Sequence, residues 1–407
     1  MTQRGATVTR AAAHTTTVGL ISGTLGAIGL IDGGGGGVWA DVLSSFGLAD
    51  SILGPAFATQ SAFVFPVLLF GGLLLSTVGI RVMLIAGTLL LAATSFAFTG
   101  LHGLALFIAL FAIRGTGLAL LDLAGNTMAM HVERDTGRHI MGIVHGGFSV
   151  GIVIGSLIAF GVYSIGGSFR AIHITLGALM LAVAVAGLLG PVPGTENSGA
   201  PPRVSLRAFN TPLVRICGIS LGLGFGAELL ISQFVSVLLR TRIEASEATS
   251  VLAVVIYATM MAIGRFGNGP LLDRFDPITL LCAQGATFAI GGAIIATSTS
   301  APVTLLGSLI GGLGVAGAVP TVLSYAASHS RSSAGEIAGA SLFGGYFGAL
   351  LLPLLAGGLT SLLSIRAGIA LVSVAGLLTI WCGIMLRQDE RSANRVARRR
   401  AGPAASG

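Results

Sequence analysis

Residues 104–130 read LALFIALFAIRGTGLALLDLAGNTMAM, an apolar run that only two ionisable side chains, Arg114 and Asp122, interrupt. A helix needs about 20 predominantly apolar residues to cross the hydrocarbon core of a bilayer. The apolar residues do not alternate with polar ones, which favours a spanning helix over a strand of a membrane barrel. The run therefore predicts a transmembrane helix with charge inside the membrane, where ionisable residues are costly and usually functional.

Similar apolar runs fill the rest of the chain. Of its 407 residues, 53% are hydrophobic and 9% are charged, whereas soluble domains carry roughly 25% charged residues. We expect an all-α integral membrane protein with about twelve transmembrane helices. The predicted spans lie near residues 16–40, 52–75, 80–99, 104–130, 140–163, 167–190, 212–239, 248–271, 278–298, 302–327, 337–363 and 366–387.

A segment rich in Pro, Gly and Ser divides these spans into two groups. We predict an N-terminal bundle over residues 1–190 and a C-terminal bundle over 211–387. Between them, residues 191–210 have the composition of a cytoplasmic linker. Residues 388–407 form a basic cytoplasmic tail, which is expected to contact anionic lipid and to help orient the chain.

The basic side chains, all of them arginines, indicate the orientation. Short cytoplasmic loops retain basic residues, and a cytoplasmic N-terminus places most arginines on that side. Only Arg170, Arg240, Arg242 and Arg366 fall outside, and Arg114 lies within a span. We expect a multi-pass protein of the inner (plasma) membrane with both termini in the cytoplasm. The arginines assigned to the cytoplasm are Arg4, Arg10, Arg81, Arg134, Arg138, Arg203, Arg207, Arg215, Arg265, Arg274, Arg331, Arg387, Arg391, Arg395, Arg398, Arg399 and Arg400.

Several classes of function are not expected. The net charge of +7 could suit nucleic acid, but the arginines lie between apolar runs and in the tail, without a soluble domain. Cys217, Cys282 and Cys382 are far apart in apolar segments, so we expect no metal and no cofactor. Residues 147–151, GFSVG, match a hydrolase motif that requires a strand-to-helix turn, yet they lie in an apolar run, so we expect no enzyme.

The chain carries an internal repeat at a constant offset of 197 residues. Agreement at one offset across several helices is what parallel repeats about an axis along the membrane normal leave in a sequence. Under this offset Asp32 falls within one position of Glu228, so each half has an acid in its first span. The other matched pairs are Gly72 with Gly269, Gly115 with Gly312, Gly117 with Gly314, and Gly151 with Gly348.

Twelve spans, a central loop and a G-x-x-x-D-R type motif after spans 2 and 8 resemble the major facilitator superfamily over nearly the whole chain. The resemblance implies two pseudo-symmetric six-helix bundles, the major facilitator fold. It assigns Gly269, Asp273 and Arg274 to a motif for conformational change, although Asp276 stands where Gly is usual. The first copy lacks the Asp-Arg pair, since Ser and Thr occupy positions 76 and 77.

Span 4 is similar to that of the fucose-permease-like branch of this superfamily, in which an acid precedes an Asn by four residues. Here Asp122 precedes Asn126. The matching acid in fucose permease couples protons to sugar. The resemblance therefore implies that Asp122 carries the proton, with Asp in place of Glu.

Ionisable residues inside spans are either functional or paired for structural reasons. Asp122 and Asn126 lie on one helix face, whereas Arg114, eight residues earlier, is about 12 Å from Asp122 along the axis. We predict an ion pair between Asp32 and Arg114. A second cluster, Asp122 with Asn126 and His145, is predicted to be the titrating site.

Removing a carboxylate from water disfavours its charged form, so buried acids are suited to bind protons at physiological pH. Asp122 is the first candidate for proton coupling, followed by Glu228 and Asp32. The substrate cavity is predicted between spans 1, 4, 7 and 10. Its candidate lining residues are Asn126, Arg114, His145, Ser149, Gln233, Trp39, Tyr257, Tyr325 and Tyr346.

Residues 33–37 are consecutive glycines directly after Asp32. Each costs about 1 kcal/mol relative to Ala in a helix, so some interaction should offset them. Two explanations stay open: an unwound segment that exposes backbone groups to substrate, or close helix packing. The matching part of span 7, before Glu228, is also rich in Gly.

These observations predict a secondary active transporter that moves a small solute by alternating access. Proton-coupled import of a sugar-like molecule by symport is favoured. The alternative is proton-driven efflux of a metabolite or an amphiphilic drug. A channel or a membrane sensor is less well supported, since neither filter repeats nor a soluble domain is present. We expect a monomer whose partners are the substrate, protons and the lipid bilayer.

Overall fold

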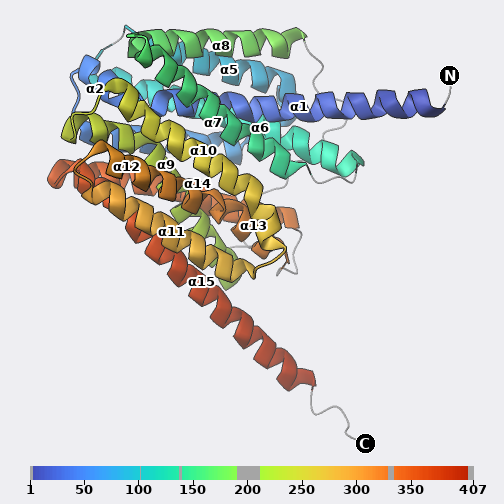
Figure 1. The fold of residues 1–407 in the computed structure, drawn as a ribbon. Helices are drawn as coiled ribbons and strands as arrows, with labels where there is room; N and C mark the ends of the chain where they lie inside the picture. The colour runs from blue at the N-terminus through green and yellow to red at the C-terminus, as the bar shows by residue number, and fades with distance from the viewer. Residues whose placement is uncertain (1–2, 101, 137–139, 190–210, 329–333, 402–407) are drawn as a thin grey trace, which may run out of the picture.

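The computed structural model of the protein describes residues 3–100, 102–136, 140–189, 211–328 and 334–401 (Figure 1). The predicted linker, 191–210, lies outside these residues. Across the described ranges the regular structure is helical, without a strand. This confirms the all-α class.

Twelve helices in these ranges are long and apolar enough to cross a membrane, as the sequence predicts. The last helix continues the final span well into the predicted tail. The elements are α1 (Gln3–Gly36), α2 (Trp39–Phe46), η1 (Asp50–Ile52), α3 (Leu53–Leu69), α4 (Gly71–Thr77), α5 (Gly79–Ala97), α6 (Leu104–Thr136), α7 (Met141–Ser164), α8 (Phe169–Leu189), α9 (Pro212–Arg242), α10 (Glu247–Leu272), α11 (Pro277–Thr297), α12 (Ala301–Ala316), α13 (Ala318–Ser328), α14 (Ala334–Leu362) and α15 (Ile365–Ala401).

Helix pairing follows one pattern in both parts of the chain. In the first set, α1–α8, α1 packs on α7, α6 packs on α3 and α5, and α8 packs on α5. In the second set, α9–α15, α9 packs on α14, α12 packs on α10 and α11, and α15 packs on α11. The two sets meet mainly where α3 contacts α14 and where α7 contacts α10. This arrangement is the pseudo-symmetry that the repeat predicts.

Both chain ends leave the bundle toward the same side, on the right in Figure 1. We call this side the terminal face. The opposite side, where α2 lies, is the distal face. Each spanning helix therefore runs between these two faces, and every polar side chain can be placed by its distance along its helix.

Glycines set the closest helix contacts in both sets. A Cβ at Gly151 of α7 would collide with the backbone of Gly26 on α1, and one at Gly348 of α14 would collide with Gly222 on α9. Gly151 and Gly348 are partners under the offset of 197 residues. The repeat therefore preserves a place where two helix backbones touch, as small residues allow in membranes.

The glycines at 33–37 also serve packing. α1 stays helical through Gly36, and the chain turns at Gly37 and Val38 before α2 begins. A Cβ at Gly33 would meet the backbone of Ile152, and one at Gly36 would lie 2.5 Å from the carbonyl of Ser232. Close packing thus explains the helical glycines, and the interruption follows directly after them.

We predict that Gly151→Ala destabilises the protein, whereas Gly161→Ala on the same helix does not. Both changes raise helix propensity by about 1 kcal/mol, but only Gly151 faces a backbone, while a Cβ at Gly161 meets no atom within 4 Å. Overpacking should cost Gly151→Ala about 1–3 kcal/mol. The measurement is the melting temperature of the purified proteins in detergent. Equal melting temperatures would contradict the packing account.

Candidate functional site

Polar and charged side chains from both helix sets gather in the otherwise apolar interior. They form two arginine–carboxylate pairs and one carboxylate that neutral groups bind. We call this group the central cluster. Its members are Asp32, Gln60, Arg114, Asp122, Asn126, Ser149, Glu228, Arg265 and Tyr346.

The first pair joins α1 to α6. Arg114 Nη2 lies 2.6 Å from Asp32 Oδ1, and the same guanidinium donates to Gln60 Oε1 on α3. The Arg114 side chain is 2% exposed, and removing one partner of such a pair leaves a costly buried charge. The predicted ion pair is present, and Asp32 is neutralised by it.

The second pair joins α9 to α10 and was not predicted. Arg265 Nη2 lies 2.8 Å from Glu228 Oε2. Its Nη1 donates to Ser149 Oγ on α7 at 2.8 Å, so Arg265 bridges the two helix sets. The sequence places Arg265 among the cytoplasmic arginines, whereas in the structure it pairs inside the bundle, with 14% of its side chain exposed, within the candidate span Glu247–Leu272. The predicted span 248–271 already contained Arg265, and that signal could have found it.

The third carboxylate, Asp122, is bound by neutral groups. Asn126 Nδ2 donates to Asp122 Oδ1 at 2.9 Å within α6. Tyr346 Oη on α14 donates to Asp122 Oδ2 at 2.6 Å, so this bond also crosses between the sets. His145 of α7 interacts electrostatically with Asp122 and Arg265. The structure thus brings together the predicted titrating residues and adds Tyr346 as a direct partner.

Toward the distal face the two sets are joined by buried polar contacts. Trp39 Nε1 donates to Gln233 Oε1 at 2.7 Å, and Ser236 Oγ donates to the carbonyl of Gly36 at 2.5 Å. Trp39 is 0% exposed, and its ring packs against Phe57 and other aromatic rings. Trp39 and Gln233 therefore hold the two sets together in this conformation. Both side chains are buried.

At the distal face itself lies an ionic network that the sequence did not predict. Arg240 Nη2 is 3.0 Å from Asp41 Oδ1 and 3.3 Å from Glu247 Oε1. Tyr163 Oη donates to Asp41 Oδ2 at 2.6 Å. Asp41 and Tyr163 belong to the first set, and Arg240 and Glu247 belong to the second. The network therefore ties the two sets at this end.

Two predicted cavity residues lie differently from the rest. Tyr257 is 0% exposed and donates to the backbone carbonyl of Glu228 at 3.4 Å, so it supports the second pair. Tyr325 packs in α13 against Val214, Cys217 and other apolar residues near the start of α9. The structure does not bring Tyr325 to the central cluster.

The predicted conformational motif lies at the terminal face, where α10 ends. Gly269, Asp273 and Arg274 are exposed there. Asp276, which stands where Gly is usual, caps α11 through the Thr279 backbone at 2.9 Å and pairs with Arg387 of α15 at 2.5 Å. Burial alone would raise the pKa of Asp276, but the bonds from Thr279 and Arg387 hold it below its usual value. This departure from the motif has a structural role.

Comparison with known proteins agrees with this architecture. The family model of the Major Facilitator Superfamily matches residues 22–351. An uncharacterized transporter of Sinorhizobium fredii, y4wD, is 28% identical over 246 residues, which are 57% of this chain and 61% of that protein. An uncharacterized MFS-type transporter of Yersinia pestis is 26% identical over 273 residues, which are 65% of this chain and 68% of that protein.

Two solved structures have a similar fold. The nucleoside transporter NupG aligns with a TM-score of 0.70 at 12% identity, over 91% of this chain and 98% of its own. The E. coli fucose:proton symporter FucP aligns with a TM-score of 0.56 at 16% identity, over 89% and 98% respectively. At such identities the likeness concerns the fold alone.

We predict that breaking the Glu228–Arg265 pair destabilises the protein more than removing it altogether. Glu228→Gln or Arg265→Gln leaves one buried charge unpaired, which costs about 3–5 kcal/mol, whereas the double change removes both charges. The measurement is the melting temperature of the three variants in detergent. As a control, Arg387→Gln breaks a more exposed pair and should cost less than about 1 kcal/mol. A double variant less stable than both single variants would contradict this account.

Proposed function

The chain belongs to the major facilitator superfamily, and we propose that it transports a small solute and that a proton bound at Asp122 drives this transport. The observation that carries the proposal is the difference between the three carboxylates of the central cluster. Asp32 and Glu228 each have an arginine partner. Asp122 is bound by the hydroxyl of Tyr346 and the amide of Asn126, both of them neutral. A proton bound at Asp122 would therefore sit on the one of these three carboxylates that has no arginine partner among the described residues.

The position of Asp122 links its proton to movement. Its bond to Tyr346 joins α6 of the first set to α14 of the second. A carboxylate accepts a stronger hydrogen bond than a carboxylic acid does. Proton binding would therefore weaken one contact between the sets, and alternating access requires such contacts to break and re-form.

The exposure of the side chains around Asp122 supports access to the site from one face of the protein. His145 is exposed, and Asp122 and Asn126 are half-buried. Trp39 and Gln233, which lie toward the distal face, are 0% and 1% exposed. This difference in exposure supports access to the site from the terminal face in this conformation. We propose that this face is cytoplasmic and that the membrane is the inner membrane. Most arginines outside the spans lie on this side, and this remains so when Arg265 is not counted.

The charge balance of the cluster favours an uncharged polar solute. Both arginines are already neutralised by carboxylates, so an anionic solute would have to displace one of them. Gln60, Asn126 and Tyr346 offer hydrogen bonds to hydroxyl groups instead. The names of the two solved neighbours specify a nucleoside and fucose, both polar solutes. We therefore favour sugar-like molecules, moved by proton symport.

Efflux of an amphiphilic solute remains the second candidate. The observation that favours it is the shortage of aromatic surface for sugar stacking. Trp39 is covered by other rings, and Tyr325 packs elsewhere. Tyr346, with Phe225 at 5.8 Å between ring centroids, is the aromatic pair next to Asp122.

The test is transport by purified protein in liposomes, with solutes first selected from sugars, nucleosides and amphiphiles by thermal stabilisation. We predict that Asp122→Asn abolishes uptake driven by a pH gradient but retains solute exchange without a gradient, because exchange needs no net proton movement. The exposed carboxylate Asp389 provides the matched control, and Asp389→Asn should transport normally.

If Asp122→Asn still accumulates solute in response to the pH gradient, Asp122 does not carry the proton. Accumulation into acid-loaded vesicles, in exchange for protons, would favour efflux over symport. Stabilisation by amphiphiles alone would also favour efflux.

A further inference from the structure

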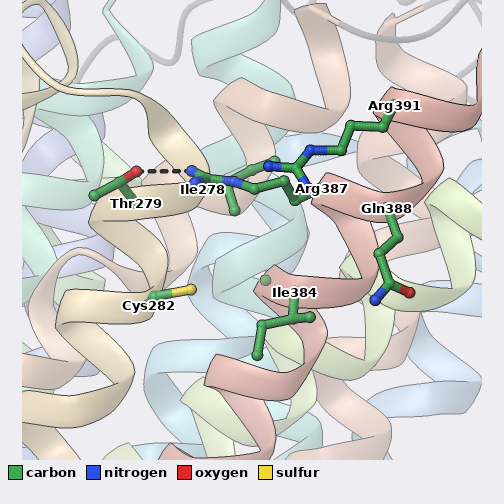
Figure 2. Close-up of a pocket in the computed structure, with 8 residues that line it drawn as sticks. Ile278, Thr279, Cys282, Ile384, Arg387, Gln388 and Arg391 are labelled. Carbon is green, nitrogen blue, oxygen red and sulfur yellow. Dashed lines mark hydrogen bonds between the residues drawn. The ribbon is translucent and has the colours of Figure 1, made fainter. Parts of the chain in front are cut away.

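A groove lies between α11 and α15 at the terminal face, away from the central cluster (Figure 2). Its volume is about 250 Å³. Ile278 and Cys282 of α11 and Ile384 of α15 line its apolar part. Arg387 and Arg391 of α15 line its polar part. One wall thus suits hydrocarbon, and the other suits an anion.

The two arginines project from one face of α15, since they are four residues apart. Figure 2 shows Arg387 reaching across to Thr279 of α11, with Arg391 further along the helix. Arg387 is held at 2.5 Å by Asp276. Arg391 is exposed and has no ion pair with the described residues. The groove therefore carries two guanidinium groups against one carboxylate.

The acidic residues of the same helix do not offset this charge within the groove. Asp389 and Glu390 lie between the two arginines in the sequence, but neither lines the groove. Beyond the groove, α15 continues to Ala401, and its sequence adds Arg395 and the arginines at 398–400. The helix thus extends the positive charge away from the bundle.

The groove lies where α15 would cross the boundary between the hydrocarbon core and the headgroups of a bilayer. The apolar span of α15 is Ile365–Ser392, so both arginines lie in its last turns. Ile384, one turn closer to the membrane centre than Gln388, is 47% exposed. Basic pockets between spanning helices at this depth are suited to lipid headgroups. An acyl chain could then lie along the exposed isoleucine.

We propose that this groove binds one anionic phospholipid, with the phosphate on Arg387 and Arg391 and the acyl chain against Ile278 and Ile384. Arginine is well suited to the phosphate because its planar guanidinium donates two parallel hydrogen bonds. The anionic class follows from the excess positive charge of the groove, which a zwitterionic headgroup with its own amine would not neutralise. This binding site is independent of the solute site and of proton coupling.

The experiment uses the full-length protein in detergent, titrated with phosphatidylglycerol, with phosphatidylcholine of the same acyl chains, or with glycerol phosphate alone. Native mass spectrometry counts bound lipid, and the melting temperature gives the apparent dissociation constant. Arg391→Gln is the test variant, because Arg391 forms no ion pair within the part of the chain that the structure describes. Arg391→Lys keeps the charge, and Arg242→Gln changes an exposed arginine at the distal face as the control.

We expect phosphatidylglycerol to bind more tightly than phosphatidylcholine. Arg391→Gln should weaken it about fivefold, the factor that corresponds to about 1 kcal/mol per basic residue near a membrane surface. Arg391→Lys should keep most of the binding, and Arg242→Gln should leave it unchanged. Equal binding of the two lipids, equal losses in Arg391→Gln and Arg242→Gln, or full stabilisation by glycerol phosphate alone would each overturn the proposal.

Discussion

The neutralisation of buried charge governs the interior of this protein. An isolated charge in a low-dielectric environment is costly. Each ionisable side chain there must therefore be paired with an opposite charge or be neutralised by gaining or losing a proton. Asp32 pairs with Arg114, and Glu228 pairs with Arg265. Among the described residues, Asp122 accepts hydrogen bonds from two neutral donors, Asn126 and Tyr346. This asymmetry makes Asp122 the acid whose protonation would change the electrostatics of the site, and it gives the proposed coupling a physical basis.

The same side chains connect the charge balance to the movement of the two helix sets. Arg265 reaches Ser149, and Tyr346 reaches Asp122, in both cases across the boundary between the sets. Packing within each set positions these side chains. Glycines such as Gly151 bring the helix backbones of a set into contact. Two closely packed sets that meet at helix contacts and at these polar bonds are suited to rocking about a central site.

The sequence predicted the architecture because membrane spanning imposes strong, local rules. Apolar runs of sufficient length gave the twelve spans, and the constant offset gave the pseudo-symmetry. The Asp32–Arg114 pair could be predicted from the sequence because the two residues lie at a similar depth in their spans. Tyr346 as the partner of Asp122, and the distal network around Arg240, depend on how the sets dock, which no local pattern records. The linker at 191–210 and the roles of the site residues stay predictions.

The central claim is that one carboxyl group of the central cluster, Asp122, gains and loses a proton while Asp32 and Glu228 stay paired with their arginines. Infrared difference spectroscopy of the purified protein, with spectra compared between acidic and alkaline pH, observes protonated carboxyl groups directly. The account predicts a pH-dependent carboxylic-acid band in the wild-type protein and in the double variant Glu228→Gln/Arg265→Gln, and no such band in Asp122→Asn. A pH-dependent band that persists in Asp122→Asn, or that disappears in the double variant, would contradict it.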